Sequence, residues 1–448
     1  MLNYGAVVKN NVIIFGPNFN KQLKPMLDDY KQIIFSDYDL CESLFDAYAN
    51  NDFTNMTSNY SKFNQPITNL TVENSVNKIA SFLTFGLGLE LVCYNKPLLN
   101  LTHLTFGHMF NQLLLNSLDD LINLTHLTFG HKFNKPLLNS LNNLINLKHL
   151  TFVGNFNQPL LNCFENLTNL THLTFGEYFN QQSLCSSKYV CKQHLYSWSP
   201  IVFIRDFDGN NFYRDFNYPL GNSLVHLTNL THLTFGHDFN CPLENSLDRL
   251  TNLTHLILSF NFNCPLGNSL DHLTNLTHLT FGNNFNCPLG NSLDHLTNLT
   301  HLTFGNNFNY PLENSLNNLT TLTYLSLGLK FDQNINLPSN IKSIKLNCNN
   351  QYIINNLPNS IDELELGYNF NLKLDNLPCS IKKIIFDEYM FNRNSIQLNN
   401  LPISVEIIKL SQDYNLKIKN IPIRLKKIIC SEKYQFINDF DNFEVETY

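Results

Sequence analysis

The sequence predicts a β-rich solenoid in which parallel strands stack coil upon coil and are joined by short helical or 3-10 turns. Two patterns predict this fold: a 23-residue block recurs along the chain, and each block contains apolar residues at alternating positions. Composition agrees, because Ala occurs only four times in 448 residues whereas Asn is about one residue in six. Ala is the best helix former, so an all-helical protein is excluded. We expect about 15–18 coils of 20–24 residues each.

The 23-residue block is clearest in the middle of the chain. It reads LTHLTFGHKFNKPLLNSLNNLIN from Leu124 and LTHLTFGNNFNCPLGNSLDHLTN from Leu276. In LTHLTF, Leu and Phe alternate with His and Thr, which predicts a strand with Leu and Phe inside and His and Thr outside. The apolar residues of NSLDHLTNL follow helical spacing and predict about one helical or 3-10 turn. One block therefore forms one coil, made of a strand, a corner, a short turn and a return.

Each block also carries two Phe residues four positions apart, and Asn follows the second one. The first of the two recurs at Phe106, Phe129, Phe152, Phe175, Phe235, Phe281 and Phe304. We expect the Phe residues of successive coils to stack inside the solenoid. The Asn residues are expected to form a ladder whose amides satisfy backbone groups at the corner between adjacent coils. This hypothesis predicts that replacing Asn286 by Leu destabilises the fold.

Changes in the repeat spacing divide the chain into six segments. They are residues 1–80, degenerate N-terminal repeats or a cap; 81–180, 23-residue repeats; 181–215, an insertion; 216–330, 23-residue repeats; 331–430, shorter repeats; and 431–448, a C-terminal cap or tail. The shorter repeats are marked by Leu-Pro or Ile-Pro pairs that begin at Leu337, Leu357, Leu377, Leu401 and Ile421. Each pair is followed by a strand-like stretch such as IKSIKLN or IDELELG.

Charge and targeting signals limit the partners and the compartment. The net charge is -7 and no segment forms a basic patch, so the electrostatic footprint of a nucleic-acid-binding protein is missing. The N-terminus has no apolar core of a signal peptide, and no apolar run reaches the ~18 residues of a membrane span. We therefore predict a cytoplasmic, non-secreted protein whose 11 Cys are free thiols. No nucleic-acid or membrane partner is expected, and a monomer is the favoured oligomeric state.

The signature F-N-x-P-[IL] recurs in phase along the chain. Its copies are Phe63–Ile67, Phe133–Leu137, Phe156–Leu160, Phe216–Leu220, Phe239–Leu243, Phe262–Leu266, Phe285–Leu289 and Phe308–Leu312. These copies resemble the FNIP repeat family, a leucine-rich-repeat-like group expanded in social amoebae and in giant viruses that infect amoebae. The resemblance covers roughly residues 60–430. It implies a leucine-rich-repeat-like solenoid that binds other proteins, located in the host cytoplasm if the source is a virus.

Some members of this family carry an N-terminal F-box and are similar to substrate adaptors of ubiquitin ligases. In this chain, residues 1–60 read as strands and turns rather than as the short helices of an F-box. The adaptor function is therefore an alternative to a plain interaction scaffold.

One stripe of side chains is the main candidate for a binding site, because it occupies the outward positions of the predicted strands. It consists of His103, His126, His149, His172, His232, His255, His278 and His301, with Thr105, Thr128, Thr151, Thr174, Thr234, Thr280 and Thr303 beside them. One interpretation is a partner-binding face, which is pH-sensitive if the imidazoles titrate near their usual pKa of ~6.5. A metal site needs three or four converging ligands, whereas a straight ladder offers neighbouring pairs. A third interpretation is a surface residue copied by duplication, without a role.

The insertion at 181–215 is the second candidate. It holds the only Trp of the chain, Trp198, and also Tyr196, Arg205 and Arg214, which are residue types enriched at binding hot spots. Insertions into repeats map to loops that often bind partners. The alternative is a decayed repeat that bulges from the stack. Cys241, Cys264 and Cys287 also recur with the 23-residue period, and duplication of a corner residue is the favoured explanation.

No motif for catalysis emerges. The sequence contains no Gly-rich phosphate loop, G-x-S-x-G, H-E-x-x-H or C-x-x-C. We therefore predict a non-enzymatic protein–protein interaction scaffold that uses no cofactor, metal or catalytic residue and binds its partner on the His/Thr strand face. The alternatives are the ubiquitin-ligase adaptor and, as a distant third, an enzyme.

Overall fold

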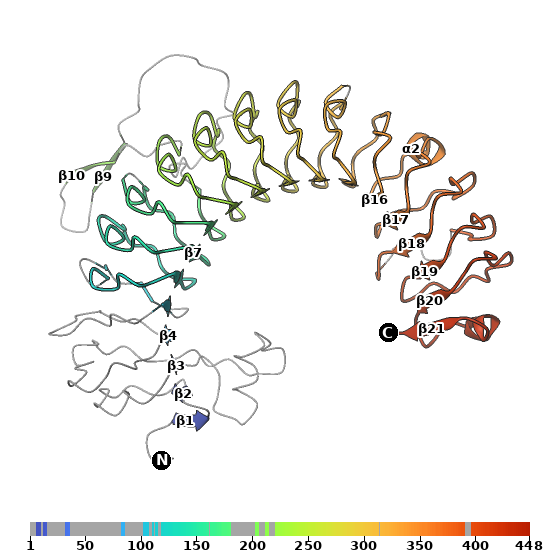
Figure 1. Cartoon of the computed structure of the whole chain (residues 1–448), viewed down its shortest axis with the longest axis horizontal. Helices are drawn as coiled ribbons and strands as arrows, with labels where there is room; N and C mark the ends of the chain where they lie inside the picture. The colour runs from blue at the N-terminus through green and yellow to red at the C-terminus, as the bar shows by residue number, and fades with distance from the viewer. Residues whose placement is uncertain are drawn as a thin grey trace. The chain divides into compact units, whose positions relative to one another are not determined.

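The computed structural model forms two compact units, Met1–Asn252 and Leu253–Tyr448. Figure 1 shows the chain coloured from blue at the N-terminus to red at the C-terminus. The structure describes residues 102–106, 110, 111, 113, 114, 118–160, 162–180, 220–312, 314–389 and 396–448, together with the backbone of strands at 6–9, 12–15, 32–35, 82–85, 202–205 and 211–214. In both units each coil contributes one short strand, and the strands of successive coils pair side by side.

In the unit Met1–Asn252 the strands form a ladder along the stack. They are β1 (Ala6–Lys9), β2 (Val12–Phe15), β3 (Gln32–Phe35), β4 (Phe82–Phe85), β5 (His103–Phe106), β6 (His126–Phe129), β7 (His149–Phe152), β8 (His172–Thr174) and β11 (His232–Thr234). From β2 onward each strand pairs in parallel with the next one in this order. Strands β1 and β2 pair antiparallel, because only two residues connect them and a parallel pair needs a crossover.

The unit Leu253–Tyr448 repeats the same arrangement with little helix among its described residues. Its elements are β12 (His255–Ile257), β13 (His278–Thr280), β14 (His301–Thr303), β15 (Tyr324–Leu327), β16 (Ser343–Leu346), α2 (Gln351–Asn355), β17 (Glu363–Leu366), β18 (Lys383–Phe386), β19 (Ile407–Lys409), β20 (Lys427–Cys430), η3 (Ile437–Phe440) and β21 (Glu444–Thr447). All ten strands pair in parallel. The predicted β-solenoid is therefore confirmed, including the strands expected after the Leu-Pro and Ile-Pro pairs.

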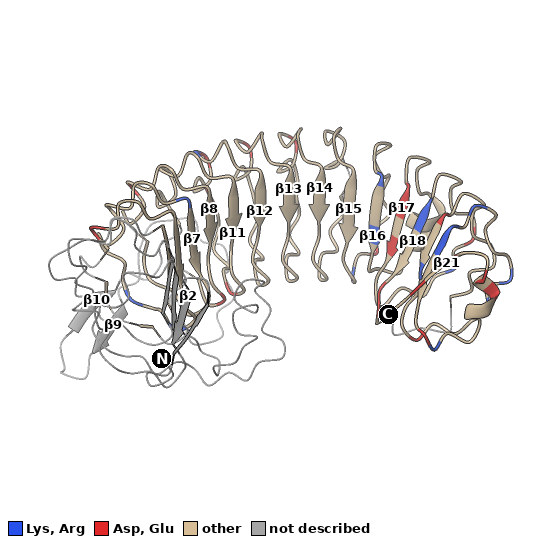
Figure 2. Ribbon diagram, turned by 60° about the horizontal axis from the view of Figure 1, so that its bottom comes forward, with Lys and Arg blue, Asp and Glu red and all other residues tan. Residues whose placement is uncertain are grey.

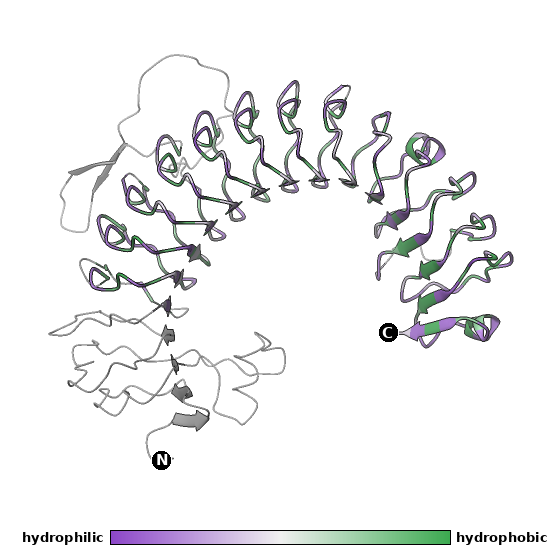
Figure 3. Ribbon diagram, viewed as in Figure 1, coloured by the Kyte–Doolittle hydropathy of each residue, from purple (hydrophilic) through white to green (hydrophobic). Residues whose placement is uncertain are grey.

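The core of each coil is made by the residues that the alternation assigns to the inside. In the coil of β14, Leu302 is 0% and Phe304 2% exposed, whereas His301 and Thr303 are half-buried. The Phe residues of successive coils stack, with the ring centroids of Phe281 and Phe304 5.2 Å apart. Figure 3 shows the resulting alternation of hydrophobic and hydrophilic stretches along each coil. Apolar burial of this kind is the main term that holds such a stack together.

The predicted turn after the strand is a series of i to i+3 hydrogen bonds rather than a regular helix. In the coil of β13, the backbone N–H of Leu296 donates to the carbonyl of Leu293 (3.1 Å), and that of Leu299 donates to the carbonyl of Leu296 (2.9 Å). All three side chains are fully buried. The three-residue spacing of these leucines therefore matches the hydrogen-bond spacing of the turn.

Two kinds of Asn tie neighbouring coils together. The Asn after the second Phe accepts a hydrogen bond from the backbone of the next coil, as Asn157 Oδ1 does from the Asn180 N–H (3.1 Å). The Asn of N-L-T donates instead, as Asn298 Nδ2 does to the carbonyl of Thr274 (2.9 Å). The structure thus confirms the expected corner ladder, adds a second ladder at the turn, and gives the N-L-T motifs a structural role.

Some glycines lie where successive coils approach most closely, so that no side chain fits there. A Cβ on Gly282, which follows the strand Phe, would overlap the carbonyl of Ser259 in the preceding coil. A second position, after Pro-Leu, adopts the left-handed region: φ is +53° at Gly267 and +51° at Gly290. Two other coils place larger residues there, Leu138 (φ 50°) and Glu244 (φ 45°), at a cost in backbone strain.

The coils before and after the insertion contact each other directly. Strand β8 pairs directly with β11, and the ring of Phe179 stacks on that of Phe239 (centroids 5.9 Å apart). Strands β9 (Val202–Arg205) and β10 (Asn211–Arg214) pair with each other, antiparallel, in a separate two-stranded sheet. From His172 to His232 the chain advances 60 residues, which is 37 more than the 23-residue step that separates other paired strands of this ladder, and residues 181–217 account for this excess.

Candidate partner-binding face

The outward histidines of Met1–Asn252 stack ring on ring. We call His103, His126, His149, His172 and His232 the first histidine ladder. Successive ring centroids lie 4.0, 4.1, 4.2 and 4.1 Å apart, with interplanar angles of 8–21°. Parallel pairing in register produces this ladder, because each histidine is the first residue of its strand. The structure thus brings these five predicted side chains together.

The unit Leu253–Tyr448 carries a shorter ladder of the same kind. We call His255, His278 and His301 the second histidine ladder; their successive ring centroids are both 4.2 Å apart. It ends at Tyr324, whose ring lies 5.4 Å from that of His301.

A row of threonines runs beside each histidine ladder. In Met1–Asn252, Thr105, Thr128, Thr151, Thr174 and Thr234 are aligned on adjacent strands and half-buried. In Leu253–Tyr448, Thr280 pairs with Thr303, and Ile257 takes the equivalent place on β12 with 43% of its surface exposed. The His/Thr face therefore exists as a regular surface in each unit.

Most ladder histidines are held by the threonine that precedes them. Thr125 Oγ1 lies 2.9 Å from His126 Nδ1 and donates to the carbonyl of Thr102 in the preceding coil (2.9 Å). Thr171 holds His172 in the same way, and Thr231 holds His232. In the second ladder Thr277 and Thr300 repeat the arrangement. This threonine was missed by sequence reasoning, although its place directly before the histidine is visible in the L-T-H-L-T motif.

Protonation of the first ladder is opposed by its surroundings. Burial lowers the pKa of His103, His126, His149 and His232, and the positive charge of neighbouring ladder histidines lowers the pKa of the first three further. Lys148, directly before His149, adds to the effect on His126 and His149. The pKa of each of these four rings therefore lies below the ordinary value of ~6.5, and each proton that the ladder accepts disfavours the next.

The geometry gives no support to the metal interpretation. In the described part of the chain, no group of three or more His, Cys, Asp or Glu side chains is placed to hold a metal ion. The ladder rings are stacked nearly parallel, so their nitrogen lone pairs point side by side and do not converge on one point.

The repeated cysteines contact the corner Asn ladder. Cys241 is buried and Cys287 half-buried, and Cys287 Sγ lies 3.3 Å from Asn263 Oδ1 of the preceding coil. Burial raises the pKa of the Cys287 thiol, which makes the thiolate scarce and the residue a poor nucleophile or metal ligand.

The predicted residues of the insertion are described only in part. Arg205 is the last residue of β9 and Arg214 the last of β10, and their strands pair antiparallel. Trp198 and Tyr196 lie outside the described residues. The role of this segment in binding stays a prediction.

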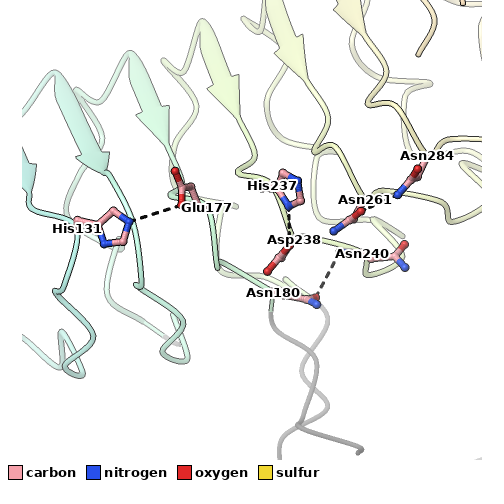
Figure 4. Close-up of polar contacts among 8 residues, drawn as sticks. All are labelled: His131, Glu177, Asn180, His237, Asp238, Asn240, Asn261 and Asn284. Carbon is pink, nitrogen blue, oxygen red and sulfur yellow. Dashed lines mark hydrogen bonds and ion pairs between the residues drawn. The ribbon is translucent and has the colours of Figure 1, made fainter. Parts of the chain in front are cut away.

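The corner after the strand carries polar contacts that sequence reasoning did not single out. His131 Nε2 lies 3.6 Å from Glu177 Oε2, and His237 Nδ1 lies 2.7 Å from Asp238 Oδ1 (Figure 4). The first contact spans two coils, since the intervening coil has Gly154 where His131 stands. Non-identical residues at otherwise equivalent positions are the signal that identifies this corner in the sequence.

The outward strand positions change character toward the C-terminus. From β16 onward they carry Ser, Lys, Glu and Ile, as Figure 2 shows for the charged residues. Most of these charges pair across strands, as Lys345 with Glu365 (3.4 Å), Lys383 with Glu363 (3.1 Å) and Lys427 with Glu444 (2.8 Å). The fold therefore accepts very different side chains at the positions that hold His and Thr in earlier coils.

Comparison with known proteins identifies the repeat. Residues 331–369 and 349–389 match the family model described as FNIP Repeat. The chain contains FNIP repeats. The matched part lies in the shorter Leu-Pro repeats of the FNIP chain, whereas the F-N-x-P-[IL] copies that suggested the family lie before residue 313. No curated protein sequence matches the FNIP chain significantly.

Several solved structures are similar to this chain. CroV588, described as a novel circular LRR protein, is 25% identical over 97% of this chain and 68% of its own, with a TM-score of 0.46. An internalin (inlF) of Listeria monocytogenes is 18% identical over 74% and 81%, with a TM-score of 0.43. The Toll–Spatzle complex of Drosophila includes a chain 14% identical over 94% and 53%, with a TM-score of 0.51. This last likeness concerns the fold alone and agrees with a leucine-rich-repeat-like solenoid.

None of the helices in the described residues is long and apolar enough to cross a membrane. The predicted cytoplasmic location and the predicted monomer stay predictions.

Proposed function

We propose that this FNIP-repeat protein is a non-enzymatic scaffold that binds a partner protein on the His/Thr strand face. The observation that carries the proposal is the regular, half-buried surface formed by the first histidine ladder and its threonine row. Strands β16–β21 keep the fold with Ser, Lys, Glu and Ile in the same outward positions. Folding therefore does not require His and Thr there, and a surface role accounts for their repetition.

The architecture suits such a role. A solenoid presents many equivalent positions on one face, and each is held rigidly by the coils on either side. A chain of this fold class is described in the Toll–Spatzle complex, which supports a protein as the partner.

The test compares two arginine variants of the tagged full chain in co-purification with mass spectrometry. The first, Thr128→Arg with Thr151→Arg, places bulk and charge on the face. The second, Thr168→Arg with Thr228→Arg, makes the same change at two exposed turn threonines. We expect a partner that the wild type and the turn variant retain and the face variant loses. A partner retained equally by both variants, or no partner in any sample, contradicts a binding role for this face.

The insertion is proposed as a second contact, since it leaves the stack as a separate element. Its candidate residues are Trp198, Tyr196, Arg205 and Arg214. A chain lacking residues 181–217 belongs in the same experiment, and loss of the partner from it would assign recognition to the insertion. Co-purification of a cullin-type scaffold would favour the adaptor alternative.

A further inference from the structure

The hydrogen bonds of the first histidine ladder determine which ring nitrogen carries the proton. Thr125 Oγ1 is 2.9 Å from both the Thr102 carbonyl oxygen and His126 Nδ1. The carbonyl oxygen can only accept, so it takes the single hydroxyl proton. His126 Nδ1 must then be the donor to Oγ1, which makes the neutral ring an Nδ1–H tautomer. The same reasoning applies to His172 and His232, at distances of 2.9–3.0 Å.

This tautomer leaves Nε2 as the basic nitrogen of His126, His172 and His232. A proton taken up by the ladder is therefore added at Nε2 and converts a hydrogen-bond acceptor into a charged donor, while the contact with threonine persists. Because successive rings are 4.0–4.2 Å apart, one protonation event changes the charge next to two other rings.

The charged groups that act on His126 and His149 are cationic. The ring of His126 is faced by His103 on β5 and by His149 on β7, and Lys148, directly before β7, and His172 on β8 act on it as well. On the described strands β5–β8 and β11, every outward position is His or Thr. These outward strand positions thus carry no carboxylate, and a bound ligand can supply one next to a protonated ring.

We propose that the first histidine ladder binds an acidic, extended segment of the partner protein and takes up protons at Nε2 as it does so. The proposal rests on the function proposed above and adds the chemistry of the partner. Carboxylates placed along the ladder offset the repulsion between protonated rings. By linkage, a ligand that favours the protonated ladder binds more tightly as the pH falls.

The experiment uses a fluorescein-labelled decamer of aspartate and the full chain, with anisotropy recorded at about pH 7.5 and about pH 5.5 in the same low-salt buffer. Aspartate, with a pKa of ~3.9, stays ionised at both values. We expect binding to tighten by about tenfold or more at the lower pH. Non-specific attraction is not expected near neutral pH, since the net charge is -7 with neutral histidines. Circular dichroism at both values checks that the chain is folded.

Two triple variants separate the ladder from other histidines. His126→Asn and His172→Asn keep an amide donor near the threonine, and His149→Asn replaces the ring that follows Lys148. None of the three asparagines takes up a proton, so the triple variant should abolish the pH-dependent gain. His226→Asn, His272→Asn and His295→Asn remove as many histidines from exposed turns and should preserve it. Equal loss in both variants, or binding that does not tighten at low pH, overturns the proposal.

A second measurement does not depend on any variant folding. Nitrogen-15 NMR of the wild-type histidines at about pH 7.5 should show the Nδ1–H tautomer for His126, His172 and His232. Finding the Nε2–H tautomer overturns the proposal. If the partner is lost from the Thr128→Arg and Thr151→Arg variant but the decamer fails to bind, the scaffold function stands and only the acidic, proton-coupled ligand is wrong.

Discussion

At the scale of one residue, the corner asparagine links two coils, because its side-chain oxygen accepts a hydrogen bond from the backbone of the next coil. Asn286 Oδ1 accepts from the backbone N–H of Asn309 (2.9 Å). Replacing Asn286 by Leu removes this acceptor, and because the site is exposed, water replaces part of it. We expect a loss of about 0.5–1.5 kcal/mol of unfolding free energy in chemical denaturation.

The matched control is Asn286→Asp, which retains a side-chain oxygen at the same place. It should be less destabilising than Asn286→Leu. Equal stability of the leucine variant and the wild type would contradict the structural role of the corner ladder.

The residue after Pro-Leu offers a stabilising change. Leu138 has φ at 50°, a region that costs a non-glycine residue about 1–2 kcal/mol, and its side chain is 58% exposed. Leu138→Gly relieves the strain and loses little buried surface, while glycine's greater freedom in the unfolded chain offsets about 0.5–1 kcal/mol. We expect a net gain of up to about 1 kcal/mol in the unfolding free energy.

The reverse substitution provides the control for this change. Gly267 occupies the equivalent position with φ at 53°, so Gly267→Leu should lower the melting temperature. If Leu138→Gly also lowers it, strain at this position is not a significant term in stability.

At the scale of the element, the coil is the unit of the fold, so an insertion between two coils can be deleted if the 23-residue step is restored. Phe179–Asn180 precedes the excluded segment and Tyr218–Leu220 follows it. Deleting residues 181–217 would join them into F-N-Y-P-L, a complete copy of the repeat signature, and restore a 23-residue step. The contacts of β8 with β11 do not involve the deleted residues.

We therefore expect the deletion variant to fold with an unchanged circular dichroism spectrum. Its melting temperature should match or slightly exceed that of the wild type, because closing a shorter loop costs less entropy. A clear loss of stability would mean that the excluded segment packs on the solenoid and contributes to its fold.

At the scale of the whole molecule, the histidines make stability depend on pH. His103, His126, His149 and His232 have pKa values lowered by burial, so the unfolded chain binds more protons than the folded one just below the ordinary value of ~6.5. Their contribution to stability is fully present above ~6.5 and is lost as the pH falls toward the folded-state values.

We expect the denaturation midpoint to fall between about pH 7 and about pH 5. The variant His103→Asn, His126→Asn and His149→Asn should show a smaller fall than the wild type. A midpoint that stays constant or rises as the pH is lowered would contradict the lowered pKa values.

The sequence by itself determined the coil and its two faces. Alternation assigns Leu302 and Phe304 to the inside and His301 and Thr303 to the outside, and identical coils stacked in register turn one such assignment into a ladder. The sequence of one repeat is enough to predict which side chains are buried, because each coil packs against coils with the same sequence pattern. The threonine before each histidine was equally visible, but its use as a link between coils required coordinates.

Only the tertiary structure decided which coils are neighbours across the insertion. Phe212–Leu220 has the local pattern of a coil, with two Phe four residues apart followed by Asn, Tyr, Pro and Leu. Phe175 nevertheless stacks on Phe235 and β10 pairs with β9. More than one strand could pair with the edge of β8, and the strand that does so depends on the packing of its whole coil. The sequence of a single repeat does not contain this information.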